Sequence, residues 1–205
     1  MTVFKRGTET VLFVHCPKTG GSSIEAAALK RGWREFYSVR GVNFLKDDAL
    51  KLSPQHMHVE LLQCFFNLKS FSSIFMIARN PFSRIKSEYY WQKGKSEHIE
   101  SPKIWLERMF DEYNDSTYIY DNHIRPQIEF DVDMQNSRWY KLENNGVKRA
   151  VVDVFGKEKF RFVRRDVRMK VSRKDPYVEE EFGRSSDMIH SFYRKDYDYF
   201  RYPRI

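Results

Sequence analysis

The chain has 205 residues, a length that suits one domain spanning residues 1–205, and its 41% hydrophobic content excludes a disordered or low-complexity protein. The 36 lysines and arginines exceed the 28 acidic residues by 8, which favours an anionic partner such as nucleic acid, an acidic membrane face or a small polyanion. Two cysteines cannot build a disulfide framework or a four-ligand zinc site. No apolar run is long enough for a membrane span or a signal peptide, so we expect a cytoplasmic protein.

Predicted strands and helices alternate along the chain. Continuous apolar runs at Val11–Val14 and Ile74–Ala78 are typical of strands buried on both faces. A helix is expected after each, the first capped by Ser22 or Ser23 and the second starting at Pro81. Further strands are expected at 139–142 and 160–163, and further helices at 59–66, 101–113, 147–155 and 187–199. This order predicts an α/β fold with a mainly parallel sheet flanked by helices, whose ligands bind at the carboxyl ends of the strands.

The first such end carries the segment Pro-Lys-Thr-Gly-Gly-Ser-Ser, residues 17–23. Adjacent glycines, Gly20 and Gly21, allow a tight turn whose successive amides point at one anion. The following helix adds free amides and the positive end of its dipole. Lys18 supplies a charge, and the hydroxyl groups of Thr19, Ser22 and Ser23 are further donors. The segment therefore predicts a site for a phosphate or sulfate group, the alternative being a turn with a solvated lysine.

Known nucleotide loops differ from this one. A Walker A loop needs its lysine after the glycines, and no G-x-G-x-x-G follows a strand, so the sequence speaks against a P-loop kinase and a dinucleotide oxidoreductase. Instead, the order Pro-Lys-Thr-Gly-Gly-Ser-Ser after a strand resembles the 5′-phosphosulfate loop of sulfotransferases that use 3′-phosphoadenosine 5′-phosphosulfate (PAPS). Such enzymes bind the 3′-phosphate with an arginine at a later strand end and a serine eight residues on. Arg79 and Ser87 match that spacing.

Other segments resemble the carbohydrate branch of that family, which includes heparan sulfate 2-O-sulfotransferase. Its His-x-His-Val segment is matched by His56–Val59, and its Asn-His-x-x-x-Gln element by Asn122–Gln127. Residues 171–177 resemble the basic loop that closes over the nucleotide, which assigns Ser172, Arg173 and Lys174 to nucleotide binding. The resemblance runs from about Val11 to Tyr202, with weaker motifs near the C-terminus, and it implies a P-loop-like three-layer fold.

The chain also departs from that branch. His15 stands where the branch has an arginine, which puts a catalytic contribution from that position in doubt. We expect a compact type, bacterial or viral, without the membrane anchor and long stem of the Golgi members.

The resemblance implies transfer of a sulfuryl group from PAPS to a hydroxyl of a carbohydrate, leaving 3′,5′-ADP. We expect His58 to be the general base, because a neutral imidazole accepts a proton near pH 7, and His56 to assist or orient the substrate. Lys18 should stabilise charge on the leaving phosphate oxygen. We expect no metal, no nucleic-acid partner and no membrane span.

Several alternatives remain open. The two histidines could bind a metal, although no ligand cluster accompanies them in the sequence, or could simply be satisfied within a loop. Tyr89, Tyr90 and Trp91 are expected in the core rather than as a base-stacking platform. Two other functions are a P-loop-like nucleotide kinase and a basic nucleic-acid-binding module.

Overall fold

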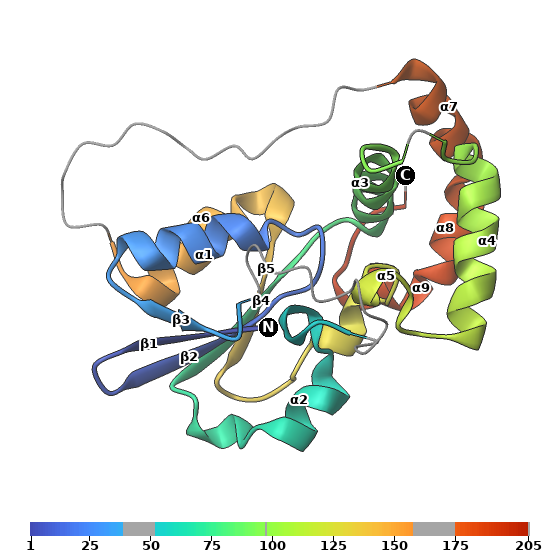
Figure 1. Ribbon diagram of the computed structural model, residues 1–205. Helices are drawn as coiled ribbons and strands as arrows, with labels where there is room; N and C mark the ends of the chain where they lie inside the picture. Colours follow the sequence, from blue (N-terminus) through green and yellow to red (C-terminus); the bar gives the residue numbers. More distant parts are fainter. Residues whose placement is uncertain (39–51, 97, 158–174, 205) are drawn as a thin grey trace.

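A five-stranded mixed sheet lies at the centre of the fold, in the order β3-β1-β2-β4-β5 (Figure 1). The computed structural model describes residues 1–38, 52–96, 98–157 and 175–204. The strands are β1 (Thr2–Arg6), β2 (Glu9–Val14), β3 (Arg34–Phe36), β4 (Ser73–Ala78) and β5 (Ser137–Lys141).

The sheet is mixed where the sequence predicts a mainly parallel one. Strand β4 pairs in parallel with β2 and with β5, but β1 pairs antiparallel with both β2 and β3. The difference arises from the hairpin of β1 and β2, whose two-residue connection contains Gly7 at a φ of 59°. Sequence analysis missed β1 because its apolar stretch gives way to Lys5 and Arg6. The half of the sheet that carries the predicted nucleotide motifs is parallel, as expected.

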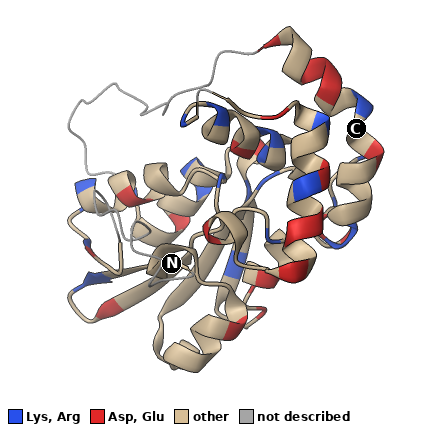
Figure 2. Ribbon diagram, turned by 45° about the vertical axis from the view of Figure 1, so that its right-hand side comes forward, with Lys and Arg blue, Asp and Glu red and all other residues tan. Residues whose placement is uncertain are grey.

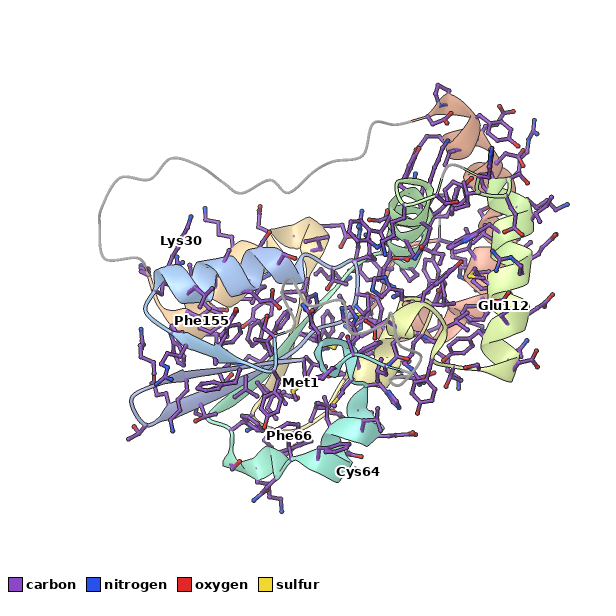
Figure 3. The ribbon with its side chains drawn as sticks, in the orientation of Figure 1. Met1, Lys30, Cys64, Phe66, Glu112 and Phe155 are labelled. Atoms are coloured by element: carbon purple, nitrogen blue, oxygen red, sulfur yellow. The ribbon has the colours of Figure 1, made fainter. Side chains whose placement is uncertain are left out.

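Helices flank the sheet, and an apolar cluster lies on each of its faces (Figure 1). Side chains alternate along β2: Val11 and Phe13 belong to one cluster, and Leu12 and Val14 belong to the other. On the Phe13 side lie α1 (Gly21–Lys30) and α6 (Gly146–Phe155), and Figure 3 labels Phe155, whose ring meets that of Phe75 edge-on. The apolar cluster on the opposite, Leu12 side of the sheet takes in residues of α2 (Val59–Phe65), α3 (Pro81–Lys93), α4 (Pro102–Asp115), α5 (Ile119–Asn122), α7 (Pro176–Arg184), α8 (Ser186–Phe192) and α9 (Arg194–Tyr199), and Figure 1 shows α4, α7 and α8 beyond one end of the sheet.

Most predicted elements are confirmed within a few residues, and the differences have physical causes. The residue that caps α1 is Gly20, at a φ of 94°, rather than Ser22 or Ser23. The long helix expected at 187–199 is two helices, because Tyr193 breaks the helical geometry between α8 and α9. The strand expected at 160–163 lies outside the described residues.

Charged residues of both signs are interspersed over the helices, as Figure 2 shows. Among the described residues, no helix combines the length and the apolar character needed to cross a bilayer.

Candidate functional site

The predicted anion loop and Arg79 lie side by side because their strands are parallel neighbours. The loop follows β2, and Arg79 follows β4, so both leave the same edge of the sheet. The guanidinium of Arg79 donates from Nη1 to the carbonyl oxygen of Lys18 over 3.0 Å. Two motifs 61 residues apart in sequence therefore form one site.

The loop exposes a run of backbone donors. Within the described part of the chain, the amides of residues 18–22 have no hydrogen-bond acceptor, and they lie at the N-terminus of α1. Lys18 and Gly20 both adopt left-handed backbone angles, with φ of 66° and 94°. Alternating backbone conformations of this kind turn consecutive amides toward one point. The arrangement is suited to an anion with several oxygen atoms.

The hydroxyl groups of the loop have different surroundings. Thr19 is buried, and its Oγ1 donates to the carbonyl of Cys16 over 2.8 Å, so this side chain closes the turn. The side chains of Ser22 and Ser23 are half-buried and make no hydrogen bond to any other described residue. Of the three predicted hydroxyl donors, the two serines are therefore available to a ligand.

The two loop glycines are required for different reasons. Gly20 has a positive φ, whereas Gly21 has an ordinary backbone conformation but lies directly beneath the ring of His15. A Cβ atom at Gly21 would come within 1.9 Å of His15 Nε2. His15 is buried and is held by Gln55, whose Nε2 lies 3.0 Å from its Nδ1. This imidazole therefore packs against the end of α1 that carries the free amides.

Lys18 extends from the loop toward α3. Its ammonium lies 4.7 Å from the centre of the Trp91 ring, and the ammonium of Lys95 lies at the same distance from that ring. Burial lowers the pKa of Lys18, and the nearby carboxylate of Glu88 opposes that effect. Trp91 is 49% exposed, so its predicted place in the core is wrong, whereas Tyr89 is buried as expected.

Gln127 fixes the backbone of Arg79. Its side-chain oxygen accepts from the Arg79 amide over 2.9 Å, and its Nε2 donates to the Arg79 carbonyl over 2.8 Å. The buried carboxylate of Asp196 in turn accepts from the Gln127 amide over 2.8 Å. Ser87 is half-buried on α3 and has no hydrogen-bond partner among the described residues. The two residues predicted to bind the 3′-phosphate therefore lie close together in the fold, Arg79 directly after β4 and Ser87 on α3, the helix that follows.

Beside the loop, two histidines are each paired with a carboxylate. His56 Nδ1 lies 2.7 Å from Asp121, and His123 Nδ1 lies 2.6 Å from Glu88. The two rings meet edge to face with centres 4.9 Å apart, and the ring of His15 lies 5.1 Å from that of His56. A carboxylate accepts hydrogen bonds only, so both Nδ1 atoms carry protons and both Nε2 atoms are left as acceptors.

A strained backbone segment supplies Asp121. Three consecutive residues, Tyr120, Asp121 and Asn122, have φ of 46°, 57° and 63°. Left-handed angles cost L-residues roughly 1–2 kcal/mol each, so side-chain contacts must hold the segment. Asp121 accepts from the amide and the hydroxyl of Ser53 as well as from His56. Strain of this kind is typical of functional sites.

His58 occupies a different environment from His56. It is 2% exposed, and Asn122 Nδ2 lies 3.3 Å from its Nδ1 while also donating to the carbonyl of His56. Because an amide nitrogen can only donate, Nδ1 of His58 is the acceptor and its proton sits on Nε2, which faces Glu60 at 3.7 Å. Burial, followed by the charge of Arg125, lowers the pKa of His58. His58 therefore carries its proton on Nε2, whereas His56 carries its proton on Nδ1.

His56, Asp121 and His123 offer metal-ligand atoms within 4.8 Å of one another, which is a cluster that the sequence did not reveal. Both oxygens of Asp121 already accept hydrogen bonds, and both Nδ1 atoms face carboxylates. This leaves two imidazole Nε2 atoms as free ligands, whereas a protein zinc site uses three or four. The described residues therefore offer fewer ligand atoms here than a zinc site uses, while a carboxylate on Nδ1 is also the usual partner of a metal-bound histidine.

Some predicted residues lie beyond this site, and some important ones were not predicted. Ser172, Arg173 and Lys174 lie outside the described residues. Asp121 and Glu88 were missed because neither stands in a motif. The left-handed segment could not be found either, since it contains no glycine.

The chain was also compared with known proteins. No match was found among protein-family models, curated proteins or solved structures.

Proposed function

We propose that this protein is a sulfotransferase that moves the sulfuryl group of PAPS to a hydroxyl group of a carbohydrate. The observation that carries the proposal is the meeting of the anion loop, residues 17–23, with Arg79 at one sheet edge, beside paired histidines. The parallel strands β2 and β4, flanked by helices, support the P-loop-like three-layer architecture that the resemblance implies.

The nucleotide is bound at two anionic points. The free amides of residues 18–22, with the hydroxyls of Ser22 and Ser23, hold the 5′-phosphosulfate. Arg79 and Ser87 hold the 3′-phosphate, and Gln127 keeps the Arg79 backbone in place. Thr19 supports the loop from within rather than contacting the ligand.

In the transfer step, His56 acts as the general base. Its Nε2 takes the proton of the acceptor hydroxyl, whose oxygen forms a bond to sulfur as the bond from sulfur to the phosphate oxygen breaks. The released electron pair stays on that phosphate oxygen, and Lys18 stabilises the charge there after its ammonium leaves the face of Trp91. Asp121 holds the tautomer of His56 that this step needs.

The contacts favour His56 as the base over His58, which was the preferred candidate from sequence. A base needs an unprotonated nitrogen facing the substrate, and His58 has Asn122 on that nitrogen. Burial lowers the pKa of His56, so its ring is neutral at pH 7. A polyanionic nucleotide at the adjacent loop would raise that pKa and make the ring a stronger base.

A ligand panel tests the nucleotide class. Thermal-shift measurements with 3′,5′-ADP, ATP and a short oligonucleotide separate a sulfotransferase from a kinase and from a nucleic-acid-binding module. We expect stabilisation by 3′,5′-ADP above that by ATP. Stabilisation by the oligonucleotide alone, lost steeply with added salt, would contradict the proposal.

The acceptor is then sought with labelled PAPS. The panel includes an unsulfated uronic-acid polysaccharide, a neutral glucan and a simple phenol, and transfer is measured as label retained on the acceptor. Transfer to a polysaccharide supports the proposal, and transfer to the phenol alone would contradict its carbohydrate part.

A further inference from the structure

Helix α3 presents two rows of side chains, and the proposed function assigns a role to only one of them. Ser87 and Trp91, one turn apart, share a face with the ammonium of Lys18 above the Trp91 ring. Arg84 and Glu88, also one turn apart, share a second face. The sequence motif accounts for Ser87 in the first row, whereas the proposed function assigns no role to Arg84 or Glu88 in the second.

Both members of the second row hold His123. Arg84 Nη1 donates to the carbonyl oxygen of His123 over 3.0 Å, and Glu88 Oε2 accepts from His123 Nδ1 over 2.6 Å. Arg84 Nη2 also donates to the carbonyl of Arg125 over 2.7 Å. The helix that follows the 3′-phosphate motif therefore fixes His123 at its backbone and at its ring.

The buried contacts of Arg84 and Glu88 contribute little net stability to the fold. The side chains of Arg84 and Glu88 are fully buried, and removing two charges from water costs about as much as their contacts return. The contacts of Glu88 with His123, Lys18 and Gln92 nevertheless outweigh burial and hold the pKa of Glu88 below its usual range. These contacts instead fix one orientation of the His123 ring, in which Nε2 is an acceptor beside the ring of His56.

We propose that His123 is a second imidazole that accepts a hydrogen bond from a hydroxyl group of the carbohydrate next to the one that His56 deprotonates, and that Glu88 is the positioning residue that orients it. This inference rests on the proposed transfer function.

The test replaces the carboxylate by its uncharged isostere, Glu88→Gln. We expect kcat for transfer from labelled PAPS to fall by about 10- to 100-fold, less than the roughly 10²–10⁴-fold that loss of a general base costs. Affinity for 3′,5′-ADP should stay within about threefold, because the Arg79 contacts are untouched. The matched control is Glu112→Gln, which removes a carboxylate paired with Arg108 on the outer side of α4 (Figure 3).

A spectroscopic readout separates positioning from general damage. Long-range ¹H–¹⁵N spectra report the tautomer of each histidine, and wild-type His123 should carry its proton on Nδ1. In Glu88→Gln the proton should move toward Nε2, while Glu112→Gln leaves it on Nδ1. An unchanged tautomer together with unchanged kcat would overturn the inference.

A second variant keeps the test valid if Glu88→Gln folds poorly. His123→Gln should lower kcat to a similar extent, and the double variant should lose little more, because both changes remove one interaction. If the reductions in kcat of the two single variants multiply in the double variant, the inference is overturned. The proposed function fails by a different result, namely a wild type that neither transfers label nor binds 3′,5′-ADP. The tautomer measurement needs no activity, so the two failures can be told apart.

Discussion

Gly21→Ala tests the packing of His15 on the anion loop. Gly21 is the first residue of α1 and has an ordinary backbone conformation, so alanine brings no backbone strain. The added Cβ would lie 1.9, 2.3 and 2.4 Å from Nε2, Cε1 and Cδ2 of His15, distances that real atoms do not adopt. The ring of His15 must therefore move.

The cost follows from what holds that ring. His15 is stacked on Phe13 with ring centres 5.2 Å apart, and its Nδ1 lies 3.0 Å from Gln55 Nε2 and 3.3 Å from Glu25 Oε1. Overpacking a buried site costs roughly 1–3 kcal/mol. Leaving a buried polar group without its partner costs roughly 1–3 kcal/mol more. We therefore expect Gly21→Ala to lower the free energy of unfolding by about 2–6 kcal/mol.

Urea denaturation measures this change. With an m-value near 2 kcal/mol/M, the midpoint should fall by about 1–3 M. The control is Gly183→Ala in α7, where the exposed position has no atom within 4 Å of an added Cβ. Alanine there should raise stability by roughly 0.5–1 kcal/mol. If both variants were as stable as the wild type or more so, His15 would not lie over the start of α1, and this account of the loop would be refuted.

Four further predictions concern the chemistry. Lys18→Ala should lower kcat at least about 10²-fold, equivalent to about 2.7 kcal/mol, and a folded variant with wild-type turnover would remove Lys18 from the mechanism. His56→Ala should lower kcat by roughly 10²–10⁴-fold with 3′,5′-ADP affinity retained, whereas His58→Ala should mainly lower stability, and the opposite ranking would make His58 the base. Turnover should survive EDTA, and its loss with recovery on adding zinc would identify the histidine cluster as a metal site. Because burial holds the pKa of His15 and His56 below the ordinary value, the unfolded chain binds more protons below about pH 6.5. Urea denaturation should therefore show the free energy of unfolding falling from pH 7 to pH 5, by up to roughly 1.4 kcal/mol per pH unit for each histidine, and a flat profile would contradict their burial as neutral rings.

The strand–loop–helix unit could be predicted because its signals are local. Val11–Val14 is a continuous apolar run, and Gly20 and Gly21 interrupt the chain directly before a helical pattern. The proximity of Arg79 to the loop was also predictable in principle, since parallel neighbouring strands end at the same edge. The pattern could not show that Gly21 makes room for His15, because only the folded chain brings that ring over the helix.

The carboxylates of the site could not be predicted, because their partners are distant in sequence. Asp121 lies 65 residues from His56, and Glu88 lies 35 residues from His123. Along the sequence, Glu88 resembles any charged residue on a helix surface. Trp91 was misplaced for a related reason: Tyr89 takes the core-facing position of α3, and two residues later the helix has turned by about 200° to face solvent.

The most direct test of the proposed function is a calorimetric titration of 3′,5′-ADP and AMP. If Arg79 and Ser87 hold the 3′-phosphate, the wild type should bind 3′,5′-ADP about 10²- to 10⁴-fold more tightly than AMP, since each of the two charge-assisted hydrogen bonds contributes about 1.5–3 kcal/mol. Arg79→Ala should weaken binding of 3′,5′-ADP, leave that of AMP nearly unchanged and so bring the ratio toward one, with Ser87→Ala doing so to a lesser degree. Equal wild-type affinity for 3′,5′-ADP and AMP would contradict the assignment of this site to PAPS.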